Sequence, residues 1–182
     1  ISEIVEPMHL HLSSQDVPYR GCLYVGLMID DSGAPSVVEY NVRFGDPETQ
    51  VTIPLISSDL CDLLLAVSEG RLSDSMPTFS NAHALTVVLA AEGYPGPPAK
   101  GRLIGGNASS KWVEMAEGKC LIHHAGTGLD DGKLISTGGR VLAATGVSEI
   151  SLQDAKNLAY KRLSEVELEG SHFRRDIGHR AL

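Results

Sequence analysis

Apolar residues recur at helical spacing in three stretches of the chain. They predict helices over residues 1–12, Ser58 to Glu69 and Ser151 to Glu167. In each stretch the apolar side chains fall every three or four positions, which places them on one face of a helix. Ser58 and Ser151 have the side chains that cap helix N-termini, and Gly70 and Gly170 follow the last two stretches as terminators.

Strand patterns fill much of the remainder. Residues 22–30 and 36–42, joined by the turn-forming loop Asp30–Pro35, predict a hairpin. Four later runs are strand-like, with glycine- and proline-rich loops at Tyr94–Gly106 and Gly126–Gly132; the runs are Ala84–Ala91, Lys119–Ala125, Lys133–Ser136 and Arg140–Thr145.

The stretch between the two groups of elements, residues 71–82, has few large apolar side chains and contains Pro77. We place a domain boundary there, which gives domains 1–76 and 77–182. The predicted fold class is α+β: a hairpin with flanking helices, then a small, mainly antiparallel β domain closed by one helix.

Composition narrows the classes of function. A formal net charge of -8 argues against binding to nucleic acid, which attracts basic surfaces. No run of about 20 apolar residues is present, so no membrane span is predicted. The cysteines Cys22, Cys61 and Cys120 are far apart and lack a Cys-x-x-Cys pair, which favours reduced thiols in the cytoplasm. We expect Cys22 and Cys61 to be buried small residues.

The candidate chemistry is densest in residues 37–50. Glu39 and Asn41 would project from the same face of the predicted strand. A carboxylate beside an amide oxygen suits Mg²⁺, which prefers oxygen ligands. Arg43 and two acids, Asp46 and Glu48, follow within a turn, as at the rim of an active site. A polar strand edge followed by an ordinary turn has the same spacing, so the spacing alone leaves both interpretations open.

A second candidate is the basic cluster near the C-terminus, made of Arg174, Arg175, His179 and Arg180. Guanidinium groups bind phosphate through paired hydrogen bonds, so this cluster could hold a phosphorylated substrate. The alternative is a solvated tail whose arginines pair with nearby acids.

Two further motifs favour structural roles. His123 and His124 are adjacent in a predicted strand and would point to opposite faces, which disfavours a shared metal ion. Gly138-Gly139-Arg140 favours a tight turn between strands over a backbone site for an anion.

Six segments, in the same order, resemble the phosphoribosylamine–glycine ligases, also called glycinamide ribonucleotide synthetases, which are ATP-grasp enzymes of purine biosynthesis. The segments are Pro18–Met28, Glu39–Gln50, Leu85–Gly96, His124–Thr127, Gly138–Leu142 and Arg174–Ala181. The resemblance runs over nearly the whole chain. The family's amino-terminal domain, and the part that clamps adenine and the phosphates, have no counterpart, so the chain is expected to be a C-terminal fragment that is inactive alone.

The resemblance implies a reaction that joins 5-phosphoribosylamine to glycine while ATP, the co-substrate, is cleaved to ADP and phosphate through an acyl phosphate. It implies that Glu39 and Asn41 hold Mg²⁺, or Mn²⁺ in its place, against the ATP phosphates. Arg43 would assist with phosphate charge. Asp46 and Glu48 are catalytic candidates for orienting the ammonium group of glycine or the attacking amine.

The same resemblance makes Arg174 and Arg175 candidates for binding the substrate phosphate. The implied partners are small molecules and the missing N-terminal portion of the polypeptide, in the cytoplasm, without nucleic acid or membrane. Two alternatives stay open: a binding module without activity, and another carboxylate–amine ligase of the ATP-grasp superfamily. The string Gly45-Asp46-Pro47-Glu48 argues against the second, because carboxylases and D-alanine ligases of that superfamily have different residues after the Glu-x-Asn pair.

Overall fold

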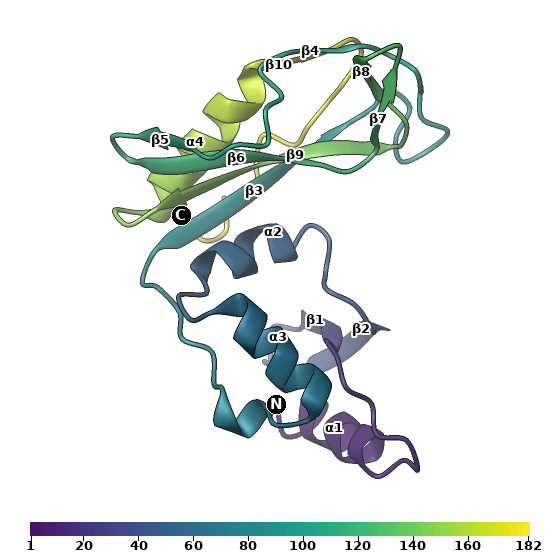
Figure 1. Ribbon diagram of the computed structural model, residues 1–182, viewed down its shortest axis with the longest axis vertical. Helices are drawn as coiled ribbons and strands as arrows, with labels where there is room; N and C mark the ends of the chain where they lie inside the picture. The colour runs from purple at the N-terminus through teal and green to yellow at the C-terminus, as the bar shows by residue number, and fades with distance from the viewer. The chain divides into compact units, whose positions relative to one another are not determined.

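The computed structural model describes residues 1–182, which form two compact units. The first unit comprises Ile1–Thr49 and Ile56–Thr78, and the second comprises Gln50–Leu55 and Phe79–Leu182. The α-helices and strands are labelled in Figure 1. In chain order the elements are α1 Val5–Ser13, β1 Tyr24–Ile29, β2 Pro35–Asn41, α2 Thr49–Thr52, the 3-10 helix η1 Ile53–Leu55, α3 Leu60–Glu69, the 3-10 helix η2 Leu72–Asp74, β3 His83–Ala90, β4 Ile104–Gly106, β5 Val113–Met115, β6 Gly118–His124, β7 Thr127–Asp130, β8 Lys133–Ser136, β9 Arg140–Ser148, α4 Leu152–Ser164 and β10 Val166–Leu168.

The first unit contains the predicted hairpin, in which β1 and β2 pair antiparallel, together with α1 and α3. Helix α3 begins one residue later than predicted, because Asp59 and not Ser58 is its N-cap: the Asp59 carboxylate accepts a hydrogen bond from the backbone N–H of Asp62. Ser58 instead accepts one from the N–H of Thr78. Gly70 ends the helix in the left-handed conformation, at φ 72°.

Burial in the first unit is slight. Ala66 is its one fully buried hydrophobic side chain. The expectation that Cys22 and Cys61 are buried is wrong, since Cys22 is half-buried and Cys61 is exposed. Cys61 lies one turn before Leu65 on a face of α3 that the unit leaves uncovered.

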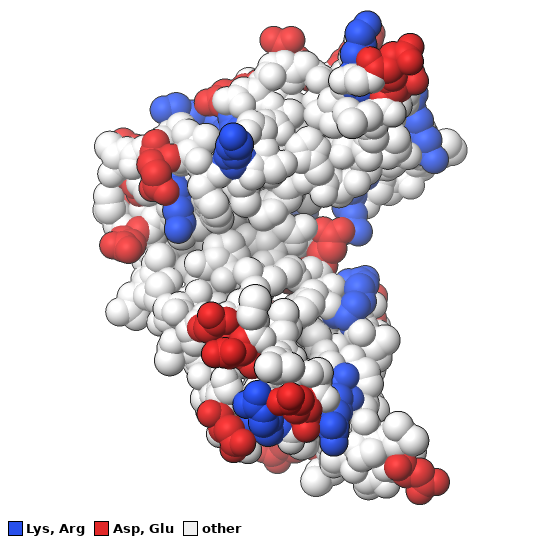
Figure 2. All heavy atoms as spheres, viewed as in Figure 1, with Lys and Arg blue, Asp and Glu red and all other residues white.

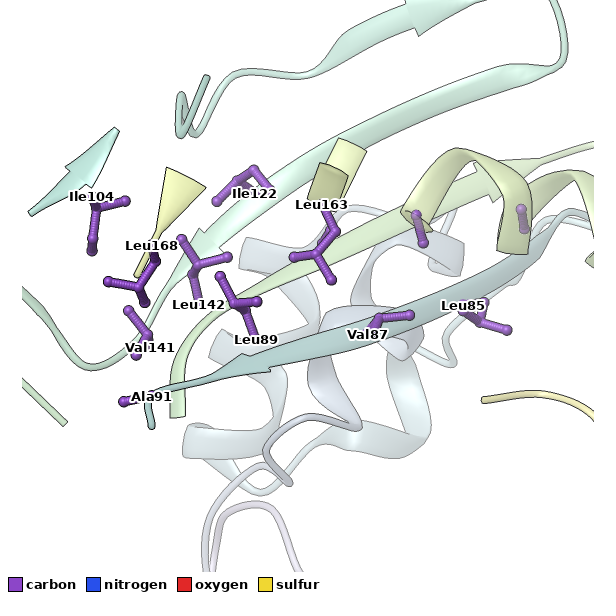
Figure 3. Packing of buried hydrophobic residues seen from close by; sticks show 13 residues of the cluster. Leu85, Val87, Leu89, Ala91, Ile104, Ile122, Val141, Leu142, Leu163 and Leu168 are labelled. Atoms are coloured by element: carbon purple, nitrogen blue, oxygen red, sulfur yellow. The ribbon is translucent and has the colours of Figure 1, made fainter. Parts of the chain in front are cut away.

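The second unit is built on a four-stranded antiparallel sheet in the order β3-β9-β6-β5, and α4 packs against β9, β3 and β6. The buried apolar residues gather between the sheet and the helix: Val87 and Leu89 of β3 lie with Leu142 around Leu163 of α4, and Leu85 lies farther along β3 (Figure 3). Two smaller antiparallel pairs, β10-β4 and β7-β8, complete the unit. The predicted α+β class with a mainly antiparallel second part is confirmed.

The central strand β9 is where the helix approaches the sheet most closely. An added Cβ at Gly146 would overlap the Ala155 carbonyl oxygen and lie 2.8 Å from the Ala159 nitrogen. The strand runs to Ser148, three residues beyond its predicted end, because β3 pairs with it as far as Ser148 and β6 as far as Val147.

Four short strands, β4, β5, β7 and β10, were not predicted. β4 lies in the loop predicted over Tyr94–Gly106, and β7 lies in the loop predicted over Gly126–Gly132. The last helix ends at Ser164 and not at Glu167, since the next residues form β10 and pair with β4. Ser151 caps α4 as predicted, accepting a hydrogen bond from the N–H of Asp154 at 3.1 Å.

The predicted boundary between residues 76 and 77 stays a prediction. Gln50–Leu55, assigned from sequence to the first domain, cluster with the second unit, and the Leu55 carbonyl accepts a hydrogen bond from the N–H of Ser80 at 2.8 Å. Acidic and basic side chains are interspersed on the face drawn in Figure 2. None of the helices has the length and apolar character that crossing a membrane requires.

We predict that Gly146→Ala lowers the free energy of unfolding by about 3 kcal/mol, because the new methyl group has rigid backbone atoms of α4 in its way. Chemical denaturation followed by circular dichroism measures the change. Gly105→Ala is the matched control: its Cβ would come no closer to any atom than 3.2 Å, and that atom is the flexible end of the Glu167 side chain. Equal stability of the two variants would contradict the close packing at Gly146.

Candidate functional site

The register of the β1–β2 hairpin sets the geometry of the first candidate site. Tyr24 pairs with Asn41 and Gly26 with Glu39, but the next pair is Leu27 with Val37, so the strand bulges at Val38. A side chain at Gly26 would have its Cβ 3.2 Å from the Glu39 Cγ. The glycine therefore gives the glutamate room to lie across the neighbouring strand.

Glu39, Asn41 and Arg43 form a row at the end of β2. The Asn41 amide donates a hydrogen bond to Glu39 Oε1 at 2.8 Å, which confirms that these two side chains share a face of the strand. Arg43 Nη2 lies 3.4 Å from Asn41 Oδ1, and its Nη1 donates to the Phe44 carbonyl at 2.8 Å. The row thus places a carboxylate, an amide and a guanidinium next to one another in contact with solvent.

The turn after this row brings Glu48 back to the hairpin. The Thr49 hydroxyl donates to the Gly45 carbonyl at 2.5 Å, and Gly45 is buried under the Glu48 side chain. Glu48 Oε1 accepts a hydrogen bond from the Tyr24 hydroxyl at 3.2 Å. Asp46, between them, is exposed.

Tyr24 is a site residue that was not predicted from the sequence. Burial raises the pKa of its hydroxyl, and the hydrogen bond to Glu48 raises that pKa further, so the tyrosine stays a donor to the carboxylate. The signal that could have found it was the hairpin itself, because the antiparallel pairing of two predicted strands puts Tyr24 opposite Asn41.

The oxygen atoms of Glu39 and Asn41 fit the chemistry of a hard divalent cation. No group of three or more His, Cys, Asp or Glu side chains gathers as a complete metal site anywhere in the chain. Mg²⁺ needs only one or two protein oxygens when phosphate oxygens and water complete its shell. Glu39 is exposed and Asn41 is half-buried, so both can be reached by a phosphate ligand from solvent.

The second candidate, the basic segment 171–180, belongs to the second unit. It pairs with the end of β3, where the backbone groups of Ala90 and His172 exchange hydrogen bonds of 2.8 and 2.9 Å. Arg174 makes two bonds to Asp176, Nε to Oδ1 at 2.9 Å and Nη2 to Oδ2 at 2.6 Å. The Arg175 guanidinium carbon lies 5.2 Å from the centre of the Phe173 ring. The segment is therefore attached to the sheet, and its two arginines have different surroundings.

The remaining motifs have structural partners. His123 Nε2 lies 3.0 Å from the Thr145 hydroxyl, and burial lowers the pKa of His123. His124 lies 3.1 Å from the Thr127 hydroxyl and 2.8 Å from the Ala108 carbonyl. Residues 137–139 form the bend between β8 and β9, where the Gly139 carbonyl accepts a hydrogen bond from the N–H of Ala91.

Comparison with known protein families gives two matches. Residues 84–180 match the family described as phosphoribosylglycinamide synthetase, C domain. Residues 1–49 match phosphoribosylglycinamide synthetase, ATP-grasp (A) domain. The second match ends just after the Glu39–Glu48 site, and the first includes the basic segment.

Individual relatives agree with these matches. The chain is 44% identical over 180 residues to the phosphoribosylamine–glycine ligase of Chlorobaculum tepidum, covering 99% of this chain and 41% of that protein. It is 44% identical over 172 residues to the trifunctional purine biosynthetic protein adenosine-3 of Gallus gallus, covering 94% of this chain and 16% of that one. The crystal structure of the Thermotoga maritima phosphoribosylamine–glycine ligase superposes with a TM-score of 0.71 at 39% identity, covering 92% of this chain and 39% of that chain.

We predict that removing Arg174 releases the Asp176 carboxyl from its charged partner. The hydrogen bonds from Arg174 lower the pKa of Asp176 to about 2, so the stabilisation from this pair is present above the unfolded-state pKa near ~3.9 and is lost as the pH falls toward 2. In Arg174→Ala the Asp176 carboxyl should titrate near its ordinary value, as measured by carbon-detected NMR.

Arg180→Ala is the control, because it removes a nearby charge of the same segment and leaves the Arg174–Asp176 pair in place. A wild-type Asp176 that titrates near ~4 would contradict the paired geometry.

Proposed function

The chain belongs to the phosphoribosylglycinamide synthetase family, and from this membership we propose that it is the C-terminal part of a phosphoribosylamine–glycine ligase. The observation that carries the proposal is the row of Glu39, Asn41 and Arg43 at the end of β2, in a chain that is 44% identical to a ligase of this name over nearly its whole length. The reaction is the ATP-dependent joining of glycine to 5-phosphoribosylamine, which forms glycinamide ribonucleotide.

We further propose that the active enzyme contains more polypeptide than these 182 residues. The chain spans about two fifths of the length of the bacterial ligase relatives. The β1–β2 hairpin exposes apolar side chains of a kind that proteins normally cover, with Met28 and Val38 each 64% exposed and Ile29 56% exposed. An isolated two-stranded hairpin has little stability in water, so further chain is expected to pack on it.

In the proposed reaction the glycine carboxylate attacks the γ-phosphate of ATP, which yields an acyl phosphate and ADP. The amine of phosphoribosylamine then attacks the acyl carbon, and phosphate leaves. Glu39 and Asn41 would hold Mg²⁺ or Mn²⁺, which supplies positive charge against the ATP phosphates when bound. Arg43, adjacent to Asn41, would add a second positive charge at the same end of the strand.

The remaining candidates have proposed roles in binding and orientation. Asp46 and Glu48 would orient the glycine ammonium or the attacking amine, and the Tyr24 hydroxyl would hold Glu48 in position for it. Arg174 and Arg175 would bind the 5′-phosphate of phosphoribosylamine through charge-assisted hydrogen bonds. The cytoplasm, where the substrates of such biosynthetic enzymes are made, is the proposed location.

We predict that the 182-residue chain alone forms no glycinamide ribonucleotide. The reason is that the residues that would clamp adenine in this family have no counterpart in it. The purified chain would be incubated with ATP, Mg²⁺, glycine and freshly prepared phosphoribosylamine, and the product measured by mass spectrometry against a blank without protein. Steady product formation would overturn the view that the chain is an incomplete ligase.

We predict that Glu39→Gln and Asn41→Ala, made in the full-length ligase, each lower kcat about 100- to 1000-fold, because each removes a group that stabilises charge in the transition state. Raising the Mg²⁺ concentration should partly restore Asn41→Ala, since a neutral ligand contributes affinity more than charge. Steady-state kinetics at limiting and saturating Mg²⁺ measure both effects.

Glu114→Gln serves as the matched control, because Glu114 is an exposed glutamate in strand β5 outside the proposed site. Wild-type rates for Glu39→Gln and Asn41→Ala at limiting Mg²⁺ would exclude the metal-binding role.

A further inference from the structure

A single side chain, Tyr160 of α4, anchors the turn that carries the basic cluster. The Tyr160 hydroxyl donates a hydrogen bond to the Arg174 carbonyl at 2.7 Å and accepts one from the backbone N–H of Ile177 at 3.3 Å. One oxygen atom thus holds both ends of the turn from Arg174 to Ile177. No other side chain bonds to both backbone positions.

Aromatic and apolar packing holds the same turn on the side that faces α4. The Tyr160 ring lies 5.9 Å from the Phe173 ring, with the two planes tilted by 52°. Tyr160, Phe173 and Ile177 all pack against the buried cluster between α4 and the sheet. The backbone on each side of Arg175 is therefore attached to the buried core of the second unit.

Within this fixed turn the two arginines differ in what their guanidinium groups have available. Arg174 donates two hydrogen bonds to Asp176, and the carboxylate of Asp176 neutralises its charge. Arg175 has no hydrogen bond or ion pair within the protein and stacks over Phe173, with 5.2 Å between its guanidinium carbon and the ring centre. Stacking uses the face of the guanidinium plane and leaves the N–H groups at its edge free, and that edge is what binds phosphate.

We propose that Tyr160 is a positioning residue, which fixes the turn so that Arg175 rather than Arg174 presents its guanidinium to the 5′-phosphate of the substrate. This inference rests on the proposed ligase function and narrows it. Arg174 and Asp176 brace the turn from its outer side. Phe173 limits the rotamers of Arg175, so less conformational entropy is lost when the phosphate binds.

The test uses the full-length ligase and steady-state kinetics with phosphoribosylamine, glycine and ATP. Tyr160→Phe removes the hydroxyl and keeps the ring. It should raise the KM for phosphoribosylamine about fivefold, with kcat and the KM values for ATP and glycine unchanged, because loosening the turn weakens only phosphate binding. Arg175→Ala should raise the same KM about tenfold or more. The factor by which Arg174→Ala raises it should be at least about fivefold smaller than the factor for Arg175→Ala.

Two further variants separate positioning from loss of stability. Tyr94→Phe is the matched control for Tyr160→Phe: its hydroxyl makes no hydrogen bond in the structure, so its KM for phosphoribosylamine should match the wild type. Phe173→Leu removes the ring under Arg175 and keeps an apolar side chain, and should raise the KM for phosphoribosylamine. The melting temperature of each variant shows whether a change in its KM comes with a loss of stability.

The kinetic results can overturn the positioning role of Tyr160 alone, or that role together with the proposed function. An active enzyme in which Tyr160→Phe keeps the wild-type KM, or in which Arg174→Ala weakens binding as much as Arg175→Ala, overturns this inference alone. A lower melting temperature with unchanged KM values also overturns it, since that is the behaviour of a purely structural residue. A full-length protein that makes no glycinamide ribonucleotide overturns the proposed function and the inference together.

Discussion

The close contact between α4 and the central strand β9 is the constraint on which the second unit depends. Small residues on β9, above all Gly146, let the helix backbone approach the sheet, and the apolar cluster fills the remaining space. Closely packed cores tolerate little change of shape, so α4 can pack on the sheet in only one position. That position in turn fixes every group that the helix holds.

Two such groups lie two residues apart on α4, and so on different faces of the helix. Tyr160 holds the turn from Arg174 to Ile177. The fully buried Arg162 holds the segment after β4, because it donates a hydrogen bond to the Ser109 carbonyl at 2.9 Å, and it also pairs with Glu165 at 2.5 Å. A buried charge without partners is costly, so the partners of Arg162 are required once the helix is seated. The helix thus acts as a scaffold from which two irregular segments take their conformations.

The candidate metal site rests on a different basis. Glu39, Asn41 and Glu48 are held by bonds to their immediate neighbours and to Tyr24, in a unit that buries only one apolar side chain fully. Exposed hydrogen bonds of this kind contribute little stability individually. If further chain packs on the hairpin as proposed, the order of this site depends on that contact, whereas the turn from Arg174 to Ile177 packs on the core of its own unit.

Periodicity in the sequence was enough to predict the three longer helices, the hairpin and the shared face of Glu39 and Asn41, because these follow from contacts between residues close in the chain. It did not predict the short helix α2. It could not predict β4 and β10, whose partners Gly106 and Val166 are far apart in sequence and lie in glycine-rich or helix-like stretches. Nor could it separate Arg174 from Arg175, since neighbouring arginines look alike until Asp176 and Phe173 are placed around them.

The bulge at Val38 has a consequence for how the hairpin tolerates variation. It divides the hairpin into an inner ladder, which carries Glu39 and Asn41, and an outer ladder that ends at the loop after Ile29. In an uninterrupted ladder, a residue gained or lost at the tip would turn the downstream side chains to the opposite face. Here the unpaired Val38 separates the two ladders, so the pairing of Gly26 with Glu39 is set independently of the pairing beyond the bulge.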